Sequence, residues 1–578
     1  MNIMNNKFYR IIINVLSVLF LITSITNFHT NSVSTGGLAY YFFYIAVTLY
    51  IIDIFIILLI TNFNIQKVLP DFILILILFF LINYKSISDY FVPGKISISI
   101  AVLAIILRNI YNIINKNENI EIKDLSQNIL RNPAKSVISS YFIITFIGTT
   151  LLTLPFAIHG SEKLGYINAL FTSTSAICVT GLSVVDTGTI FTLFGQIIIL
   201  ILIQLGGLGI MIFSTFISFM LYRKISIEDT ITLSYVLNQK DMSSLFRNIK
   251  NIILTAFVIE TIGTFFLFVK FQTIYGFSFK SLYYSIFHSV SAFCNAGFSL
   301  MPDSLMSYKS SPITIFTIAI LIIAGGLGFS TISNVFQYLE YKIKKIKKNY
   351  SGPIIKISDN TKIVLITSSI LTIISFFMIY ALEHNNTLAK EHIGTQYLSS
   401  FFQAVTLRTA GFNTMNTSLF HSSTYLFMMI MMYIGGASGS TAGGVKVNTL
   451  AIIVIRIRAF MRNQETTIAF NKTISRDIIV RCFMILFLSI SLIITALFIL
   501  TISDSKQDFI KLAFETISAF GTVGLSGGIT AELSSIGKLI IIILMFIGKT
   551  GPLTLFSAVA NHKKSVKIQY PSADVMIG

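Results

Sequence analysis

Long apolar segments recur along the whole chain and are separated by short polar stretches. About a dozen of them approach the roughly 20 residues that a helix needs to cross a bilayer. Four precede residue 115 and eight more follow in pairs: 9–26, 40–60, 68–84 and 96–113, then 138–157 with 190–221, 250–270 with 312–338, 362–382 with 423–455, and 477–503 with 535–560. Strict alternation of apolar and polar residues, the pattern of a transmembrane barrel, is absent. The pattern therefore predicts an all-α polytopic membrane protein.

The composition supports this prediction. Hydrophobic residues make up 54% of the chain and charged residues 11%, against about 45–50% and about 25% in soluble proteins. So few charges cannot cover a water-soluble surface, which excludes a soluble enzyme and an intrinsically disordered chain. The first apolar segment has basic flanks but no small-residue cleavage site before Asn27, which favours a retained helix over a signal peptide. The three cysteines lie in apolar segments, so structural disulfides are not expected.

The net charge of +18 would suggest nucleic-acid binding in a soluble protein. No polar domain interleaves basic and aromatic residues here, so we expect no nucleic-acid partner. With the N-terminus inside, most of the 42 Lys and Arg residues fall in inner segments, as the positive-inside rule requires. Both termini are therefore expected on the cytoplasmic side of the plasma (inner) membrane. The densest inner cluster is either a membrane-anchoring charge run or a partner-docking surface: Lys342, Lys344, Lys345, Lys347 and Lys348.

A short semi-polar segment separates the two spans of each pair, and these four segments resemble one another. In each, a Phe stands ten residues before a Gly that is followed by Leu or Phe: Phe171 and Gly181, Phe287 and Gly297, Phe401 and Gly411, Phe514 and Gly524. The glycines lie 116, 114 and 113 residues apart, a period that indicates an internal duplication. We expect an N-terminal extension of about four helices, a cytoplasmic linker and four repeats: 1–114, 115–136, 137–224, 225–345, 346–465 and 466–578.

Each semi-polar segment is too short to cross the bilayer and too polar to face lipid. About ten helical residues reach only half-way through, and an extended limb must then return to the same side. Non-helical backbone at that depth is tolerated only inside protein or along a watery cavity. Four such hairpins around one axis would supply a ring of carbonyls that can replace the water of a cation. The alternative, glycines that merely permit tight helix packing, explains a single glycine better than four at a matching period.

These segments resemble those of the Trk/Ktr/HKT superfamily of potassium transporters, in which four membrane–pore–membrane repeats in one chain mimic a tetrameric potassium channel. The resemblance covers about residues 130–578 and leaves the N-terminal extension without an assigned role. It implies a potassium filter built from twelve residues: Val179, Thr180, Gly181, Asn295, Ala296, Gly297, Thr409, Ala410, Gly411, Thr522, Val523 and Gly524. All four repeats keep Gly, whereas in the superfamily Ser at the first of these positions goes with sodium preference.

Two further motifs, Arg408–Thr414 and Gly548–Thr554, look most like those of KtrB, the membrane subunit of Ktr systems. This resemblance implies a homodimer with one pore per chain. It also implies a cytoplasmic nucleotide-binding ring of the KtrA type, because the longest inner loop of the core, 222–249, cannot hold such a domain. Potassium would be the substrate, and no cofactor is expected in this chain. Passive flow and coupling to sodium or protons are all compatible with these residues.

Gly-rich breaks are expected in the second span of every repeat: Gly206–Gly207, Gly325–Gly326, Gly435–Gly436 and Gly548. In the third repeat the break expands into a run of small residues that cannot hold a regular helix and resembles the family's intramembrane gating loop. The expected gate residues are Gly435, Gly436, Ser438, Gly439, Ser440, Thr441, Gly443, Gly444, Lys446 and, from the final span, Lys549. A Walker phosphate loop is the rival interpretation, but it requires Lys directly after Gly and a preceding strand.

Lys549 stands where related proteins usually carry Arg. We expect its amine to face the cavity near the gating loop and to pair with polar groups around Ser438 to Thr441. The alternative is that the amine reaches the inner interface and has no part in conduction.

The remaining charged residues near the filters are expected either to line the outer mouth of the pore or to support the structure. Asp186 and Asp303 follow the first and second filters on the outer side, where acidic groups concentrate cations or are ordinary solvated loop carboxylates. Arg408 and Glu515 are expected to support the pore helices, and Glu260 to pair inside the bundle with an unidentified partner. No catalytic or metal-ligand spacing recurs, so we do not expect an enzyme.

The expected function is potassium uptake through the filter, gated by the third-repeat loop. A polytopic membrane enzyme, such as a lipid-modifying transferase, would need an intramembrane acid/base or metal cluster. An alternating-access carrier for an organic solute is the other alternative.

Overall fold

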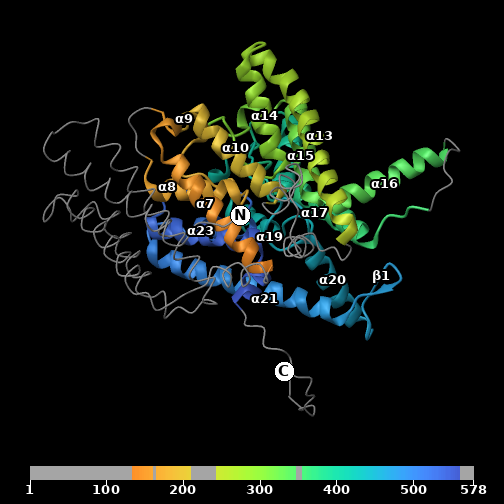
Figure 1. Ribbon diagram of the computed structural model, residues 1–578. Helices are drawn as coiled ribbons and strands as arrows, with labels where there is room; N and C mark the ends of the chain where they lie inside the picture. Colours follow the sequence, from red (N-terminus) through yellow and green to blue (C-terminus); the bar gives the residue numbers. More distant parts are fainter. Residues whose placement is uncertain (1–132, 160–163, 210–241, 347–353, 560–578) are drawn as a thin grey trace, which may run out of the picture.

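The computed structural model describes residues 133–159, 164–209, 242–346 and 354–559. These parts of the chain are helical apart from loops and one two-stranded hairpin (Figure 1). The four N-terminal spans, most of the 115–136 linker, most of the 222–249 loop, Lys347 and Lys348 lie outside the described residues, and so does the C-terminal tail.

Each repeat contains a first helix, a pore helix and a second helix. Repeat 1 consists of α7 (Pro133–Leu152), η1 (Pro155–Ala157), α8 (Tyr166–Ile177), α9 (Thr187–Ile190) and α10 (Leu193–Leu208). Repeat 2 consists of α13 (Met242–Tyr275), α14 (Phe279–Phe293), η2 (Met306–Tyr308), α15 (Pro312–Leu327) and α16 (Phe329–Ile346). Repeat 3 consists of α17 (Asp359–Glu383), α18 (Ile393–Thr406), η3 (Thr417–Leu419), α19 (Ser422–Tyr433) and α20 (Val447–Met461).

The antiparallel hairpin of β1 (Ile468–Ala469) and β2 (Lys472–Thr473) joins the third repeat to the fourth. Repeat 4 consists of α21 (Arg476–Ser503), α22 (Phe509–Gly521), η4 (Thr530–Glu532), α23 (Ser535–Thr550) and α24 (Pro552–Val559).

The first helix of each repeat is continuous and apolar. Among the described residues, α7, α13, α17 and α21 are each long and apolar enough to cross a membrane, and the bent pair α15–α16 is a fifth candidate if counted as one span. Large side chains on these helices are exposed, including Phe265, Phe377 and Phe487. Exposed apolar surface on this scale marks a face that contacts lipid rather than water. The prediction of an all-α membrane fold is confirmed.

The second helices are broken, but the predicted position was wrong in three repeats. α10, α15 and α23 continue as regular helix through Gly206, Gly325 and Gly548. They end instead at a later glycine with a φ of 87°, 84° and 85°: Gly209, Gly328 and Gly551. A positive φ of this size is strained for any residue with a Cβ, so the turn requires glycine there.

The glycines inside the helices have a different role, which is close packing. A Cβ placed on Gly206 would lie 1.9 Å from the carbonyl oxygen of Ile177, the last residue of pore helix α8. Gly325 and Gly548 make the same approach, also at 1.9 Å, to the carbonyl oxygens of Phe293 and Phe520. The absence of a side chain lets each second helix support the end of its own pore helix.

The repeats are arranged as a closed ring. Each second helix packs against the pore helix of the next repeat: α10 against α14, α15 against α18, α19 against α22, and α23 against α8. The last of these contacts joins the fourth repeat to the first. The pore helices therefore surround one axis although they are far apart in sequence.

Candidate functional site

The four segments predicted to form the filter share a backbone conformation that is rare for residues with side chains. The first filter residue of each repeat has a positive φ: 57° at Val179, 57° at Asn295, 66° at Thr409 and 49° at Thr522. Few non-glycine residues adopt this left-handed region. Its recurrence in four repeats at the same position indicates a constraint imposed by the site rather than local chance.

The four filter glycines meet at the axis. A Cβ on Gly181 would lie 2.4 Å from the carbonyl oxygen of Ala296, in the next repeat. The same contact recurs around the ring, at 2.8 Å from Gly297 to Ala410, 2.7 Å from Gly411 to Val523 and 2.1 Å from Gly524 back to Thr180. Each glycine thus borders the carbonyl oxygen of the neighbouring repeat, and the ring closes. Only glycine fits at these four positions.

The end of each pore helix holds its filter segment in place. In repeats 1, 2 and 4, the middle filter residue donates its N–H to a serine carbonyl five residues earlier: Thr180 to Ser175 at 2.8 Å, Ala296 to Ser291 at 2.7 Å and Val523 to Ser518 at 2.8 Å. A backbone bond of this kind fixes the direction in which the filter carbonyls point.

The hydroxyls at these helix ends form a second set of bonds. Ser175 Oγ accepts the N–H of Gly181, and Ser518 Oγ accepts the N–H of Gly524. In the other two repeats the direction reverses, because the hydroxyl donates to the carbonyl that follows the filter glycine: Ser291 to Phe298 and Thr406 to Phe412. The sequence alone does not predict a role for these hydroxyls, although a Ser at the same place in three repeats is a visible signal.

The third repeat is offset by one residue. The sequence equates Phe401 with the other three phenylalanines, but the fully buried ring in repeat 3 is Phe402, and Phe401 is half-buried against Phe316. Ala410 accordingly donates to Thr406, four residues earlier, instead of five. Repeat 3 therefore has one residue fewer in the turn between pore helix and filter. The spacing from Phe401 to Gly411, which matches that of the other repeats, did not reveal this difference.

A cavity of about 260 Å³ opens on one side of the filter and is lined by all four filter glycines. Asp186 and Asp303 also line it, as the sequence suggested for an outer mouth. One carboxylate oxygen of each is engaged locally: Asp186 Oδ1 accepts the N–H of Thr189, and Asp303 Oδ2 accepts the N–H of Ser307. The cavity thus combines negative charge with direct access to the glycine ring.

The Gly/Ser-rich loop of repeat 3 lies on the opposite side of the filter. A Cβ on Gly443 would lie 2.2 Å from the hydroxyl of the filter residue Thr522. The loop is bonded to repeat 2, since Ala437 and Thr441 donate their N–H groups to the carbonyls of Gly326 and Gly325 at 2.9 and 3.3 Å. The loop therefore spans the axis beneath the filter.

Further bonds attach the loop to the neighbouring second helices. Gly444 donates to the carbonyl of Gly548 at 3.2 Å, in repeat 4, and Gly439 accepts from the N–H of Phe329 at 3.2 Å, in repeat 2. Across the base of the loop, Gly435 donates to Val445 at 2.9 Å. Both partners in each of these contacts are backbone groups.

Two partly buried lysines end at carbonyls of this loop. Lys549 Nζ donates to the carbonyl of Thr441. Lys446 Nζ donates to the carbonyls of Ala442 and Gly443, within the loop itself. Among the described residues, neither amine forms an ion pair with an acidic side chain.

Arg408 connects three parts of the third repeat. Its guanidinium donates to the backbone carbonyl and hydroxyl of Ser368 on α17 at 3.3 Å, and to the carbonyl of Gly435 at the start of the loop at 3.2 Å. Its own carbonyl accepts the side-chain amide of Asn295, from the second filter, at 3.2 Å. Arg408 therefore links a pore helix, a membrane-spanning helix and the loop.

Glu515 and Glu260 are buried in polar surroundings. Glu515 accepts the hydroxyls of Ser526 and Thr530, which lie beyond the fourth filter. Glu260 accepts the side-chain amide of Gln204, on α10 of the first repeat, at 3.1 Å. Gln204 is thus the partner that the sequence did not identify for Glu260. Within the described ranges no group of three His, Cys, Asp or Glu residues could hold a metal ion.

The geometry agrees with the comparisons to known proteins. The TrkH family model, described as a cation transport protein, matches residues 103–568. The chain is 39% identical over 448 residues to Ktr system potassium uptake protein B of Bacillus subtilis, covering 77% of this chain and 97% of the relative. The protein of the same name from Vibrio alginolyticus is 39% identical over 456 residues, covering 78% and 96%.

Two further similarities are informative. Potassium/sodium uptake protein NtpJ of Enterococcus hirae is 37% identical over 453 residues, covering 77% of this chain and 97% of that protein. The crystal structure of the potassium transporter TrkH from Vibrio parahaemolyticus shares the fold with a TM-score of 0.58 at 15% identity, covering 84% of this chain and 96% of that chain. The resemblance to the Trk/Ktr/HKT superfamily is confirmed: this chain belongs to the TrkH family of cation transport proteins.

Proposed function

We propose that this chain takes up potassium across the plasma membrane through the filter formed by its four repeats. The observation that carries the proposal is the closed ring in which each filter glycine borders the carbonyl of the next repeat. Carbonyl rings of this kind replace the hydration shell of an ion as it is bound. The relatives named potassium uptake protein B, which align with most of this chain, support potassium as the substrate.

Ion entry in this proposal begins at the cavity with Asp186 and Asp303. Negative charge at a pore mouth raises the local concentration of cations. The C-terminal ends of the pore helices carry partial negative charge and favour a cation at the axis. The hydroxyls of Ser175 and Ser518 hold the limbs of repeats 1 and 4, so the carbonyls do not have to rearrange when the ion arrives.

The loop beneath the filter is the proposed gate. Backbone bonds to repeats 2 and 4 and the bond from Lys549 hold this loop, and in this proposal it closes the ion path. Opening requires these bonds to break together while the loop moves aside. The glycines and serines of the loop keep the free-energy cost of such a movement low, because few packed side chains have to be displaced.

The finer aspects of the proposal rest on the resemblance to Ktr systems and, for the termini, on the distribution of Lys and Arg along the chain. We propose a homodimer with one pore per chain, cytoplasmic termini, and a cytoplasmic nucleotide-binding ring of the KtrA type that controls the gate. The name of the Enterococcus hirae relative, a potassium/sodium uptake protein, supports sodium as a coupling or activating ion. No enzymatic step is part of the proposal.

Rubidium uptake tests this function. The purified chain in proteoliposomes should accumulate rubidium, and external potassium should compete with it. A matched control is Gly411→Ala, whose Cβ would lie 2.7 Å from the carbonyl oxygen of Val523 and should abolish uptake without removing any charge. Folded protein that moves an organic solute but no rubidium would instead support a carrier, and a covalently altered lipid would support a membrane enzyme.

A further inference from the structure

Helix α16 leaves the pore region at a large angle. It follows α15 directly in sequence, but the pair bends by 103° at Gly328. The first residue of α16, Phe329, bonds to the gating loop through its N–H. From there α16 runs outward from the helical body (Figure 1). Its 18 residues correspond to about 27 Å at 1.5 Å per residue.

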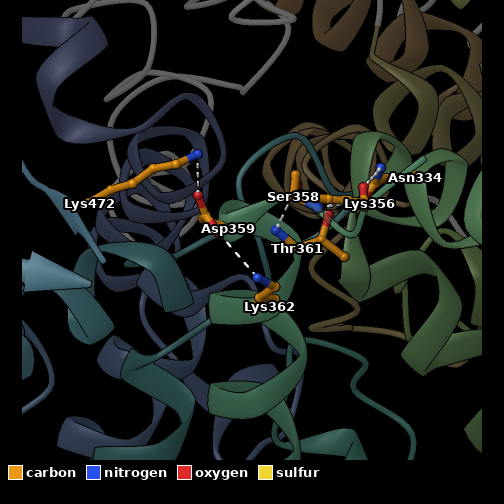
Figure 2. Close-up of polar contacts among 7 residues, drawn as sticks. All are labelled: Asn334, Lys356, Ser358, Asp359, Thr361, Lys362 and Lys472. Carbon is orange, nitrogen blue, oxygen red and sulfur yellow. Dashed lines mark hydrogen bonds and ion pairs between the residues drawn. The ribbon is translucent and has the colours of Figure 1, made fainter. Parts of the chain in front are cut away.

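Polar contacts fix the orientation of α16. Ser358 donates its N–H to Asn334 Oδ1 at 2.9 Å, and Asn334 Nδ2 donates to the carbonyl of Lys356 at 3.5 Å (Figure 2). Next to this contact, Asp359 at the start of α17 pairs with Lys472 of the β1–β2 hairpin at 2.8 Å and with Lys362 at 3.4 Å (Figure 2). Asn334, in the second turn of α16, therefore attaches the start of this helix to the segment that leads into α17.

The opposite side of α16 is apolar and exposed. Phe336, Leu339, Ile343 and Ile346 have 57%, 47%, 54% and 79% of their surface exposed. Spacings of three, four and three residues place them on one face of a helix. Tyr341, about half a turn away, is buried. The exposed face is thus a defined stripe rather than scattered apolar residues.

Lysines are concentrated at the outer end of α16, where Lys342 borders the stripe and Lys345 lies on the side of the buried Tyr341. Lys342 and Lys345 lie in the last two turns of α16, and each ammonium stacks over a tyrosine of the same helix, Tyr338 and Tyr341. These contacts hold the amines near the helix without neutralising their charge. Lys344 pairs with Glu340 on the other side of the stripe.

We propose that α16 lies in the inner leaflet and that its last two turns bind the headgroups of anionic phospholipids. An apolar stripe bordered by lysines is the pattern of helices that lie at a membrane interface, with acyl chains against the stripe and phosphates against the amines. A second copy of this chain is a poorer match for the basic end, because the chain carries 42 Lys and Arg but only 24 Asp and Glu. The inference is independent of which ion the pore conducts.

The chain contains no tryptophan, so one introduced tryptophan gives a signal from a single site. We would place it in the stripe as Phe336→Trp, with Tyr341→Trp as the matched control on the buried side of the same helix. The full chain is reconstituted in vesicles of phosphatidylcholine and phosphatidylglycerol that carry brominated acyl chains, which quench tryptophan on contact. We expect strong quenching of Phe336→Trp and weak quenching of Tyr341→Trp. If Phe336→Trp does not fold, Ile343→Trp tests the same face.

The headgroup is tested by brominating one lipid at a time in an equimolar mixture. Brominated phosphatidylglycerol should quench Phe336→Trp at least about twofold more than brominated phosphatidylcholine, since each lysine near an anionic surface contributes on the order of a fivefold preference. Adding Lys342→Gln and Lys345→Gln should bring the ratio close to one, whereas Lys538→Gln on α23 should leave it unchanged. Equal quenching by both lipids in the lysine-containing chain would overturn the assignment of the headgroup. If Phe336→Trp is not quenched, or is quenched only after the chain is diluted in the membrane, the proposed lipid contact is wrong. Either result would indicate that protein covers the stripe.

Discussion

Lys549 offers the most direct test of the gate, because a single bond joins it to the loop. Its amine donates to the carbonyl of Thr441, on the loop segment beneath the filter. A bond from a charged donor contributes about 1.5–3 kcal/mol, and a neutral one about 0.5–1.5 kcal/mol. Lys549→Met removes the bond and the charge, while Lys549→Gln keeps a neutral donor. Lys549→Arg keeps the charge and adds a planar set of donors that can reach a second carbonyl.

These differences set the expected order of basal flux. If the bond stabilises only the closed loop, Lys549→Met should raise the open fraction by about 10- to 150-fold, since about 1.4 kcal/mol corresponds to a factor of ten. Lys549→Gln should raise it by roughly five- to twelvefold, from a difference of about 1–1.5 kcal/mol between charged and neutral bonds. Lys549→Arg should lower it. Lys446 cannot compensate, because its amine bonds within the loop rather than to another repeat.

Basal rubidium uptake by proteoliposomes without any cytoplasmic partner is the appropriate assay, normalised to the amount of reconstituted protein. Lys538→Gln is the matched control, because Lys538 lies on the same helix but contacts Asn168 at the other end. Selectivity for potassium over sodium should stay the same in all variants, since the filter is untouched. Equal uptake by the wild-type chain and the Arg, Gln and Met variants would refute a role of Lys549 in gating.

Three further outcomes are expected. Gly181→Ser should weaken discrimination of potassium against sodium, because any Cβ there approaches the carbonyl of Ala296 to 2.4 Å; unchanged sodium permeation in a folded variant would contradict the filter assignment. Shortening the loop between Ser438 and Gly443 should raise flux and reduce its dependence on a partner, and a folded variant that conducts no faster would exclude the loop as the barrier. A soluble nucleotide-binding protein should copurify at low salt and dissociate as salt is raised, because contacts between exposed charges are screened within about 10 Å at 0.1 M. Recovery of the chain alone at low salt would argue for a self-sufficient transporter.

The sequence predicted the features that repeat. Four glycines at a near-constant period identified the duplicated unit, and in the structure they form one ring around the axis. The long first helices could also be predicted, because a continuous apolar run of that length is typical of a membrane-spanning helix. Features common to all repeats reinforce one another in a sequence, and this is why the architecture could be inferred.

Features that distinguish one repeat from another were harder to predict. The offset in repeat 3 was hidden because Phe401 and Phe402 are adjacent, and only packing decides which ring is buried. The predicted positions of the helix breaks were wrong because the second helices contain glycines with two different roles. One glycine allows close packing against the pore helix, and the glycine three residues later forms the turn with positive φ. The bond between Glu260 and Gln204 joins two repeats, and no spacing along the chain predicts a pairing of that kind.

Among the described residues, the loop that we propose as the gate occurs in the third repeat alone, and this has a consequence for how such a pore can arise. In an assembly of four identical subunits, any segment inserted beneath the filter would appear four times, and four copies could not occupy the single space on the axis. Fusing the repeats into one chain removes that restriction, because one quarter can diverge while the others keep the ring intact. The proposed barrier to flow can then change through substitutions in the third repeat without any matching change in the other three. Because the repeats are covalently linked, the conductance of this fold can change through one repeat alone, which is impossible in an assembly of four identical subunits.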